Sequence, residues 1–268
     1  MEATTRTMAN AVALVNTTWK NEPMWFMFHC EGTWATWCPE LGESSRVSPD
    51  HFDMFSNGCA HGCGTGDIID LLAGVGVHAG QQPDGGYWWP DWDLMMIGGQ
   101  ACTNEPNAPH CPGQTDTEYR TEFTFWSLAS SPLVFATDPR NLTAIMREVL
   151  FNTELIAANQ DPNPRPAMGA VRVRSAACAP ASSAQCQVWH RAPGADGVHY
   201  VILYNPNAVG SGNVSFSFTW ADAGLTQGTQ ARVRDMWRHA DIGTFTNSYT
   251  TAVDIAPHEA RALKVTPL

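Results

Sequence analysis

The sequence predicts two domains in tandem, an α/β domain over residues 1–162 and an antiparallel β domain over residues 167–268. In the first part, short apolar runs alternate with segments whose apolar residues recur at helical spacing, an order typical of a parallel sheet with crossover helices. In the second part, short segments of alternating polarity are separated by Gly, Asn and Pro, as in antiparallel sheets. Residues 162–166, Pro-Asn-Pro-Arg-Pro, have the composition of a linker and divide the two patterns.

The α/β domain is expected to begin with a helix over residues 4–19, because its apolar residues from Met8 to Val15 share one helical face. A near-continuous apolar run over residues 24–30 then predicts a parallel strand that is covered on both faces. The further elements expected in chain order are a helix entered between Arg46 and Phe55, a helix over 67–75, a strand over 77–81, a helix over 115–131, a strand over 132–137 and a helix over 142–157.

The β domain is expected to consist of short antiparallel strands joined by turns. Alternating segments bounded by turn residues predict these strands. The predicted strands lie at 171–174, 187–190, 200–204, 214–219 and 232–237.

Charge is divided unevenly between the two parts. Residues 1–162 carry 6 Lys and Arg against 20 Asp and Glu, a balance of −14, whereas residues 163–268 carry 9 against 6, a balance of +3, for a formal net charge of −11. The acidic first part argues against nucleic acid as a partner, since phosphates require a basic surface. No apolar run approaches the roughly 18 residues that a membrane-spanning helix requires, so no membrane span is expected.

The eight cysteines, an even number, fit an oxidising compartment. Cys102 and Cys111 bracket a short loop, as do Cys178 and Cys186, so each pair is expected to form a local disulfide. Residues 59–63, Cys-Ala-His-Gly-Cys, also offer metal-ligating side chains, but this spacing is uncommon in zinc sites and no metal site is predicted. The remaining cysteines, whose pairing the sequence leaves open, are Cys30, Cys38, Cys59 and Cys63.

Residues 87–95, Tyr-Trp-Trp-Pro-Asp-Trp-Asp-Leu-Met, form the most informative segment. Asp91 and Asp93 are two residues apart, so in an extended backbone they project to the same face. Carboxylates accept hydrogen bonds from hydroxyl groups, and indole planes cover the apolar faces of sugar rings. This composition indicates sugar binding, and the alternative is a surface loop with a tryptophan cluster packed beneath it.

Residues 85–95 resemble the Gly-Gly-Trp-Asn-Asp-Pro-Asp-Met-Leu segment of the alpha-galactosidase (melibiase) family, glycoside hydrolase family 27. Residues 155–162, Leu-Ile-Ala-Ala-Asn-Gln-Asp-Pro, are similar to that family's Val-Ile-Ala-Val-Asn-Gln-Asp-Pro. Residues 125–134 and 138–142 resemble its Trp-Ala-x-x-x-x-Pro-Leu and Asp-Leu-Arg-Asn-Met motifs. Residues 233–237, Val-Arg-Asp-Met-Trp, resemble the Val-Arg-Asp-Leu-Trp of its terminal β-sandwich.

The resemblance implies a fold and an activity. The fold is a partial (β/α)8 TIM barrel, strands five to eight only, followed by an antiparallel β-sandwich domain. The activity is retaining hydrolysis of terminal alpha-linked galactose from an oligosaccharide or glycoconjugate, with no cofactor, in the secretory pathway or in an extracellular, lysosomal or vacuolar compartment. Retention requires two carboxyl groups about 5–5.5 Å apart, one acting as nucleophile and the other as acid/base.

The resemblance assigns the acid/base role to Asp50. The family's motif after the sixth strand reads Ser-Trp-Arg-x-x-x-Asp-Ile, and residues 44–51 match it at Arg46 and Asp50, with Ser45 and His51 in place of Trp and Ile. Arg46 is implied to hold a sugar hydroxyl. Without the resemblance, the same two residues indicate an i,i+4 ion pair at the start of a helix with Asp50 as N-cap.

The resemblance also implies four further substrate-binding residues. Glu31, after Cys30, matches the fifth-strand acid that binds a galactose hydroxyl. The family commonly has Trp directly after this acid, where this chain has Gly32, with Trp34 nearby. Asp93 is implied to bind the sugar and Asp91 to support it.

The family's nucleophile lies in a Tyr-Leu-Lys-Tyr-Asp-Asn-Cys-like segment ending the fourth strand, and no such segment occurs in these residues. The expectation is an alpha-galactosidase whose nucleophile-bearing first half is missing from this chain. The alternatives are a non-catalytic galactoside-binding homologue and a truncated gene product. Because four barrel strands cannot close, the chain alone is expected to aggregate or to form a homodimer.

Overall fold

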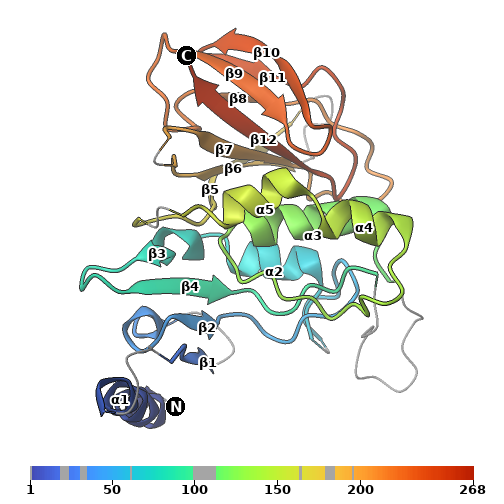
Figure 1. Cartoon of the computed structure of the whole chain (residues 1–268). Helices are drawn as coiled ribbons and strands as arrows, with labels where there is room; N and C mark the ends of the chain where they lie inside the picture. The colour runs from blue at the N-terminus through green and yellow to red at the C-terminus, as the bar shows by residue number, and fades with distance from the viewer. Residues whose placement is uncertain are drawn as a thin grey trace.

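A computed structural model of the chain describes residues 2–18, 24–30, 35–60, 62–98, 113–162, 165–178, 185–194 and 196–268. In Figure 1 a small parallel sheet lies near the N-terminus, helices α2 to α5 lie above it, and antiparallel strands follow at the far end. Helix α1 (Glu2–Thr18) confirms the helix expected over residues 4–19 and lies beside β1 and β2, farthest from the antiparallel strands.

The parallel sheet consists of β1 (Met27–His29), β2 (Ser44–Arg46) and β4 (Tyr87–Asp91), with β3 (Gly80–Gln81) antiparallel to β4 at the edge. The strand order is β1-β2-β4-β3. The register pairs His29 with Arg46 and Arg46 with Asp91. Because paired residues of neighbouring strands project to the same face, Arg46 and Asp91 leave the sheet together at its carboxyl end.

One element expected in this region is wrong, and a second is confirmed only at its end. The segment from Arg46 to Phe55 contains the end of β2 and then irregular backbone, and the next helix is α2 (Thr65–Leu71). The backbone of this segment bonds to distant loops instead: Val47 N–H donates to the Asp91 carbonyl at 2.9 Å, and the Asp50 carbonyl accepts from Cys63 N–H at 2.7 Å. The strand expected over 77–81 is mostly a 3₁₀ turn (Val75–His78), followed by the two residues of β3.

Helix α3 (Asp116–Leu128) confirms the helix expected over 115–131, whereas the helix expected over 142–157 is divided into α4 (Ala144–Leu150) and α5 (Thr153–Asn159). The break lies at Asn152, whose Oδ1 accepts the N–H groups of Glu154 and Leu155, both at 3.1 Å. This is an N-cap, which starts a new helix rather than continuing the old one. The strand expected over 132–137 is reduced to one parallel bridge between Phe135 and Met95.

The second domain contains an antiparallel sheet in the order β10-β9-β12-β7-β6-β5 and a two-stranded sheet, β11-β8, so the predicted antiparallel class is confirmed. Each of the five strands expected from the sequence overlaps an observed strand. The strands of the larger sheet are β5 (Val171–Ala177), β6 (Gln185–Arg191), β7 (His199–Tyr204), β9 (Gln230–Asp235), β10 (Ala240–Thr246) and β12 (Ala260–Pro267), and those of the smaller are β8 (Ser217–Thr219) and β11 (Ser248–Thr250).

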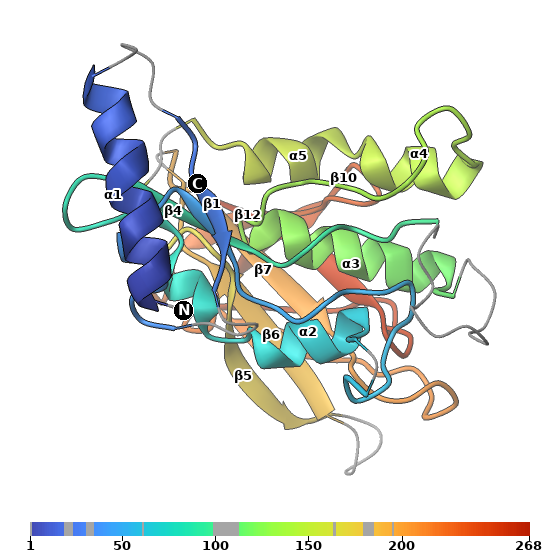
Figure 2. The ribbon, with the colours of Figure 1, turned by 90° about the horizontal axis from the view of Figure 1, so that it is seen from below.

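Strand β7, near the middle of the larger sheet, is buried on both of its faces. Along β7, Val201 and Leu203 pack into a core with residues of β8 and β11, whereas Ile202 and Tyr204 face the helices of the first domain. Phe125 of α3 meets Tyr204 edge-on, with ring centroids 5.2 Å apart. Figure 2 shows α3 between α2 and α5, so this helix contacts other helices on its flanks while it packs on the sheet. A continuous core therefore joins the two domains.

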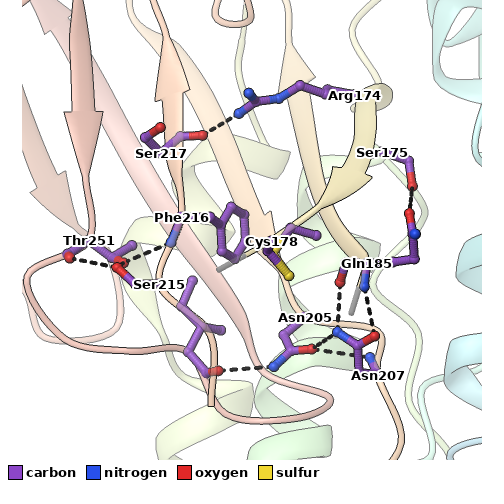
Figure 3. Close-up of a disulfide and its surroundings, with 12 residues drawn as sticks. Arg174, Ser175, Cys178, Gln185, Asn205, Asn207, Ser215, Phe216, Ser217 and Thr251 are labelled. Carbon is purple, nitrogen blue, oxygen red and sulfur yellow. Dashed lines mark hydrogen bonds between the residues drawn. A yellow bond between two sulfur atoms is a disulfide. The ribbon is translucent and has the colours of Figure 1, made fainter. Parts of the chain in front are cut away.

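Three disulfides join described cysteines. Cys178–Cys186 confirms one predicted local pair, and it ties the end of β5 to β6 (Figure 3). The pairing that the sequence left open is Cys30–Cys38 and Cys59–Cys63. The Cys59–Cys63 disulfide takes up both thiols of the candidate metal motif. Cys102 and Cys111 lie outside the described residues.

Within the part of the chain that the structure describes, no helix is both long enough and apolar enough to cross a membrane.

Replacing Asn152 with Ala is expected to lower the free energy of unfolding by about 2–3 kcal/mol, measured by urea unfolding. The substitution removes the α5 cap and also the bond from Asn152 Nδ2 to the Met236 carbonyl, at 3.1 Å, which crosses to the β domain. Thr143→Ala is the matched control, because Thr143 caps α4 through a 3.4 Å contact with Met146 N–H. It should cost only about 0.5–1 kcal/mol. Equal losses would contradict a role for Asn152 between the domains.

Candidate functional site

Two neighbouring parallel strands bring charged side chains to one place. Arg46 ends β2 and Asp91 ends β4, and the two are paired in register. Asp50 and Asp93 follow in the loops after these strands. The structure therefore gathers four of the residues singled out in the sequence at the carboxyl end of the sheet.

The guanidinium group of Arg46 lies between two carboxylates. Its Nη2 forms an ion pair with Asp50 and lies 3.4 Å from Asp93 Oδ2. Arg46 Nε donates to the Ser48 carbonyl at 3.2 Å, which fixes the direction of the side chain. The Asp50 side chain is 60% exposed, whereas that of Asp93 is 13% exposed. The i,i+4 ion pair expected at a helix start thus exists on non-helical backbone, with one acid open to solvent and one largely enclosed.

Asp93 is held in a backbone conformation that a residue with a side chain seldom adopts, with φ at +79°. Its N–H donates to Asp91 Oδ1 at 2.9 Å, and its carbonyl accepts from Trp126 Nε1 at 2.8 Å. Its own Oδ1 accepts Leu94 N–H at 2.9 Å, and its Oδ2 accepts His51 N–H at 2.8 Å. These partners hold a strained backbone, and such strain concentrates at functional sites.

Asp91 is buried beneath Asp93. Burial, together with the negative charge of Asp93, raises the pKa of Asp91 to about 6, and the bond from Asp93 N–H and the charge of Arg46 oppose the rise. The strand ends at Asp91, so the expected alternation does not extend to Asp93. The two acids differ instead: Asp91 bonds to the backbone of Asp93, and Asp93 bonds to the neighbouring loop.

The tryptophans of this segment are mainly core residues. Trp88 and Trp92 are fully buried, and Trp88 Nε1 donates to Ser45 Oγ at 3.0 Å. Their indole planes are therefore covered by protein and cannot stack on a sugar, which corrects the interpretation of the cluster as an aromatic platform. Trp89 is half-buried and lines a cavity of about 510 Å³ together with Trp25, Leu133 and residues 159–162.

His51 lies behind the acids, and the sequence reasoning assigned it no role. It is fully buried, and burial lowers the pKa of its imidazole to about 4. The ring stacks at a tilt on Trp126, with centroids 5.0 Å apart. In the sequence, the one feature that pointed to His51 was its position in the motif, where it replaces an isoleucine.

Glu122 of α3 is a second buried group that the sequence reasoning missed. Its Oε1 accepts Met96 N–H at 2.6 Å, and its Oε2 accepts Gln114 Nε2 at 2.7 Å. Burial raises the pKa of Glu122 to about 8, so the carboxyl is mostly protonated at neutral pH. An acid among Phe123, Phe125 and Trp126 in the middle of a helix was the signal for it.

Glu31 and Trp34, the other candidate substrate-binding residues, lie outside the described residues.

The β domain matches a known family. Residues 183–265 match the family described as "Alpha galactosidase C-terminal beta sandwich domain". The chain is also similar to an alpha-galactosidase of Cyamopsis tetragonoloba, with 28% identity over 245 residues that make up 90% of this chain and 50% of that protein. Alpha-galactosidase 3 of Arabidopsis thaliana is 31% identical over 234 residues, 87% of this chain and 45% of that protein. The chain thus spans about half the length of the curated relatives it matches.

The fold is shared with solved structures. Alpha-galactosidase I of Mortierella vinacea superimposes with a TM-score of 0.73 and 24% identity, over 97% of this chain and 62% of that one. The chain therefore shares the fold of the corresponding part of that structure.

Replacing Glu122 with Gln is expected to raise the stability of the protein relative to the native chain as the pH rises. The folded-state pKa of Glu122 is raised, so its stabilising effect is present below about pH 4.5 and is lost as the pH rises through 8, by about 1.4 kcal/mol per pH unit. The neutral amide of Gln does not ionise, so the variant does not lose stability in this way as the pH rises.

Urea unfolding at pH 5, 7 and 9 measures this effect. Glu118→Gln, one turn away on α3, is the control with opposite sign. Although burial acts to raise it, the bonds from His258 and Thr115 lower the pKa of Glu118, so its carboxylate stabilises the fold above about pH 4.5 and this variant should lose stability at all three pH values. A Glu122→Gln variant equally destabilised at all three pH values would contradict a protonated Glu122.

Proposed function

We propose that this chain, a homologue of the alpha-galactosidases of glycoside hydrolase family 27, carries the acid/base and sugar-binding half of a retaining active site. The substrate proposed is a terminal alpha-linked galactoside. The single observation that carries the proposal is the convergence of Asp50, Arg46 and Asp93 at the carboxyl ends of β2 and β4. A polar cluster at this end of parallel strands is where barrel enzymes place their catalytic groups.

The proposed architecture is half of a (β/α)8 barrel. In this assignment β1, β2 and β4 are strands five to seven, and residues 132–137 take the place of strand eight. The parallel pairing of β1 with β2 and of β2 with β4 supports it, as does the parallel bridge between Met95 and Phe135. Helices α2 to α5 lie on one side of these strands, between them and the β domain, as crossover helices of a barrel do (Figure 1).

Asp50 is proposed as the acid/base. Its exposed carboxyl can reach a substrate, and its ion pair with Arg46 fixes its direction. As an acid, Asp50 gives its proton to the glycosidic oxygen while a second carboxylate attacks the anomeric carbon and forms a glycosyl-enzyme. As a base, it then removes a proton from the water that hydrolyses this intermediate.

Asp93 is proposed as the sugar-binding acid, with Arg46 beside it and Asp91 as its support. The carboxylate of Asp93 is fixed by two backbone N–H groups, and it retains lone pairs for sugar hydroxyls. A rigid acceptor costs little entropy when a ligand binds. Glu31 and Trp34 are proposed to complete this side of the sugar pocket.

The nucleophile is proposed to come from the half of the relatives' length that this chain does not span. An upstream segment or a separate polypeptide could supply it. The surface that such a partner would cover is apolar and exposed: Trp25 is 59% exposed, Met27 47% and Val134 50%, beside the 510 Å³ cavity. A second copy of this chain would also cover this surface and form a homodimer, but it would add no nucleophile.

A non-catalytic galactoside-binding protein is the second candidate. It is favoured by the fact that Arg46, Asp91 and Asp93 are assembled within this chain alone, without the proposed missing half. A truncated product with no function of its own is the third. The three disulfides support a secretory, extracellular or lysosomal or vacuolar location for each of them.

Asp50→Asn, assayed with the missing barrel half supplied, is expected to lower turnover of an aryl alpha-galactoside by about 10²–10⁴-fold, because a general acid/base is lost. The 268-residue chain alone is the control. It should show no turnover, and light scattering should show association. Unchanged turnover in the variant would remove Asp50 from the mechanism. Full activity of a monomeric chain would contradict the need for a second half.

Asp93→Ala is expected to weaken galactose binding more than Asp91→Ala does, as measured by calorimetric titration of the completed barrel. The reason is that Asp93 is proposed to contact the sugar hydroxyls and Asp91 to act through Asp93. Circular dichroism of each variant checks that the fold is intact. A larger loss from Asp91→Ala would reverse the two roles.

A further inference from the structure

We infer that His51 is a positioning residue that fixes the candidate acid/base, Asp50, relative to the candidate sugar-binding acid, Asp93. This inference rests on the proposed function for its catalytic meaning. The hydrogen-bond geometry of His51 can be tested whether or not the proposed function is right.

Three hydrogen bonds join His51 to two other parts of the chain. Its backbone N–H donates to Asp93 Oδ2 at 2.8 Å, and its Nδ1 lies 2.9 Å from the Leu94 carbonyl. A carbonyl oxygen only accepts, so Nδ1 carries the hydrogen. Nε2 is then the acceptor, and it receives the hydroxyl hydrogen of Thr65 at 3.0 Å. The imidazole is therefore a neutral Nδ1–H tautomer that links the loop after β2, the loop after β4 and the start of α2.

The residues on either side of His51 are fixed by a second set of bonds. The Asp50 carbonyl accepts from Cys63 N–H at 2.7 Å, and Phe52 N–H donates to the Cys63 carbonyl at 3.0 Å. Cys63 is itself tied to Cys59 by a disulfide. The backbone of Asp50 is thus held at its carbonyl while His51 connects it to the opposite loop.

Burial favours a neutral imidazole, and the charge of Arg46 acts in the same direction, whereas the Leu94 bond and the charge of Asp93 oppose it. Three charged or titratable groups face it from two sides: Asp93 and Arg46 from the sheet, and Glu122 Oε1 from α3 at 4.0 Å. Trp126 covers one ring face and also donates to the Asp93 carbonyl. His51 and Trp126 therefore act on the same residue, Asp93, from the buried side.

The family motif that residues 44–51 resemble has isoleucine at this position. Isoleucine would fill the space but would offer no side-chain bond to Leu94 or Thr65. In this chain the spacing between the two acids depends on directional hydrogen bonds. Loss of those bonds should loosen the two loops together, because one side chain connects them.

The test uses the full 268-residue chain and three variants. His51→Leu removes both side-chain bonds, and His51→Asn keeps a donor where Nδ1 lies. Thr65→Val removes only the acceptor bond at Nε2 and keeps the volume. The first measurement is the ¹⁵N NMR signature of the His51 ring in the native chain, which should show a neutral Nδ1–H tautomer from pH 5 to 8.

The second measurement is amide hydrogen exchange. His51→Leu should speed exchange of residues 50–52 and 93–95 by about tenfold or more, as expected for a lost buried hydrogen bond. His51→Asn should restore most of the protection. The exchange rates of Thr65→Val should lie between those of the Leu and Asn variants. Exchange in β6 and β7 should not change in any variant. An Nε2–H tautomer or an imidazolium at pH 7 would overturn the inference, as would equal exchange in the Leu and Asn variants or faster exchange throughout the chain.

The third measurement separates this inference from the proposed function. Galactose binding, followed by NMR titration of the native chain, should weaken about tenfold in His51→Leu and recover in His51→Asn. If the native chain binds no galactose while the ring signature and the exchange pattern hold, sugar binding by this chain is refuted and the role of His51 in positioning stands. If galactose binds equally well to all variants, His51 does not position the sugar site and the inference is refuted.

Discussion

The guanidinium group of Arg46 is the charge on which the candidate site depends, because three carboxyl groups surround it. It forms an ion pair with Asp50, lies 3.4 Å from Asp93, and its charge opposes the rise in the pKa of Asp91. Acids this close repel one another, and a cation between them lets all three remain near one place. Arg46 can do so because it is part of β2, where backbone pairing with Asp91 sets its position. The electrostatics of the site therefore follow from the register of the sheet.

Helix α3 connects this site to the rest of the molecule. On one side, Glu122 and Trp126 bond to the loop after β4, at Met96 N–H and the Asp93 carbonyl. On the other side, Thr121 accepts from Ala260 N–H and Phe125 packs on Tyr204 of the β domain. The residues of each set are four positions apart, which places each set on one face of the helix. The β domain thus holds in place the helix that supports the acids, although it contributes none of them.

The sequence predicted those elements whose burial follows a simple period. Helices α1 and α3 and the β strands were found because apolar spacing decides them. The expected helix from Arg46 to Phe55 was wrong, because its spacing is a local pattern whereas the bonds that decide its backbone reach to Asp91 and Cys63. Asp50, Arg46 and Asp93 were identified from the motif resemblance, and their functional roles stay predictions. The sequence offered no basis for assigning a role to His51 or Glu122, because a buried polar side chain acquires its partners only when distant loops meet. Composition also cannot distinguish an indole in the core, such as Trp92, from one at the surface.

The burial of both faces of β7 has a consequence for how the chain finds its native pairing. In most half-buried strands a slip by one residue exposes apolar side chains, and that penalty selects the right alignment. In β7 a slip would exchange Val201 and Leu203 for Ile202 and Tyr204, one apolar set for another. The register of β7 must then be set by polar contacts just after its end. There Asn205 Nδ2 donates to the Ile255 carbonyl at 3.0 Å, and Asn207 Nδ2 donates to the Gln185 carbonyl at 2.7 Å (Figure 3). We therefore expect these two amides to select the alignment of β7, so that their loss should favour a shifted register and association of the chains.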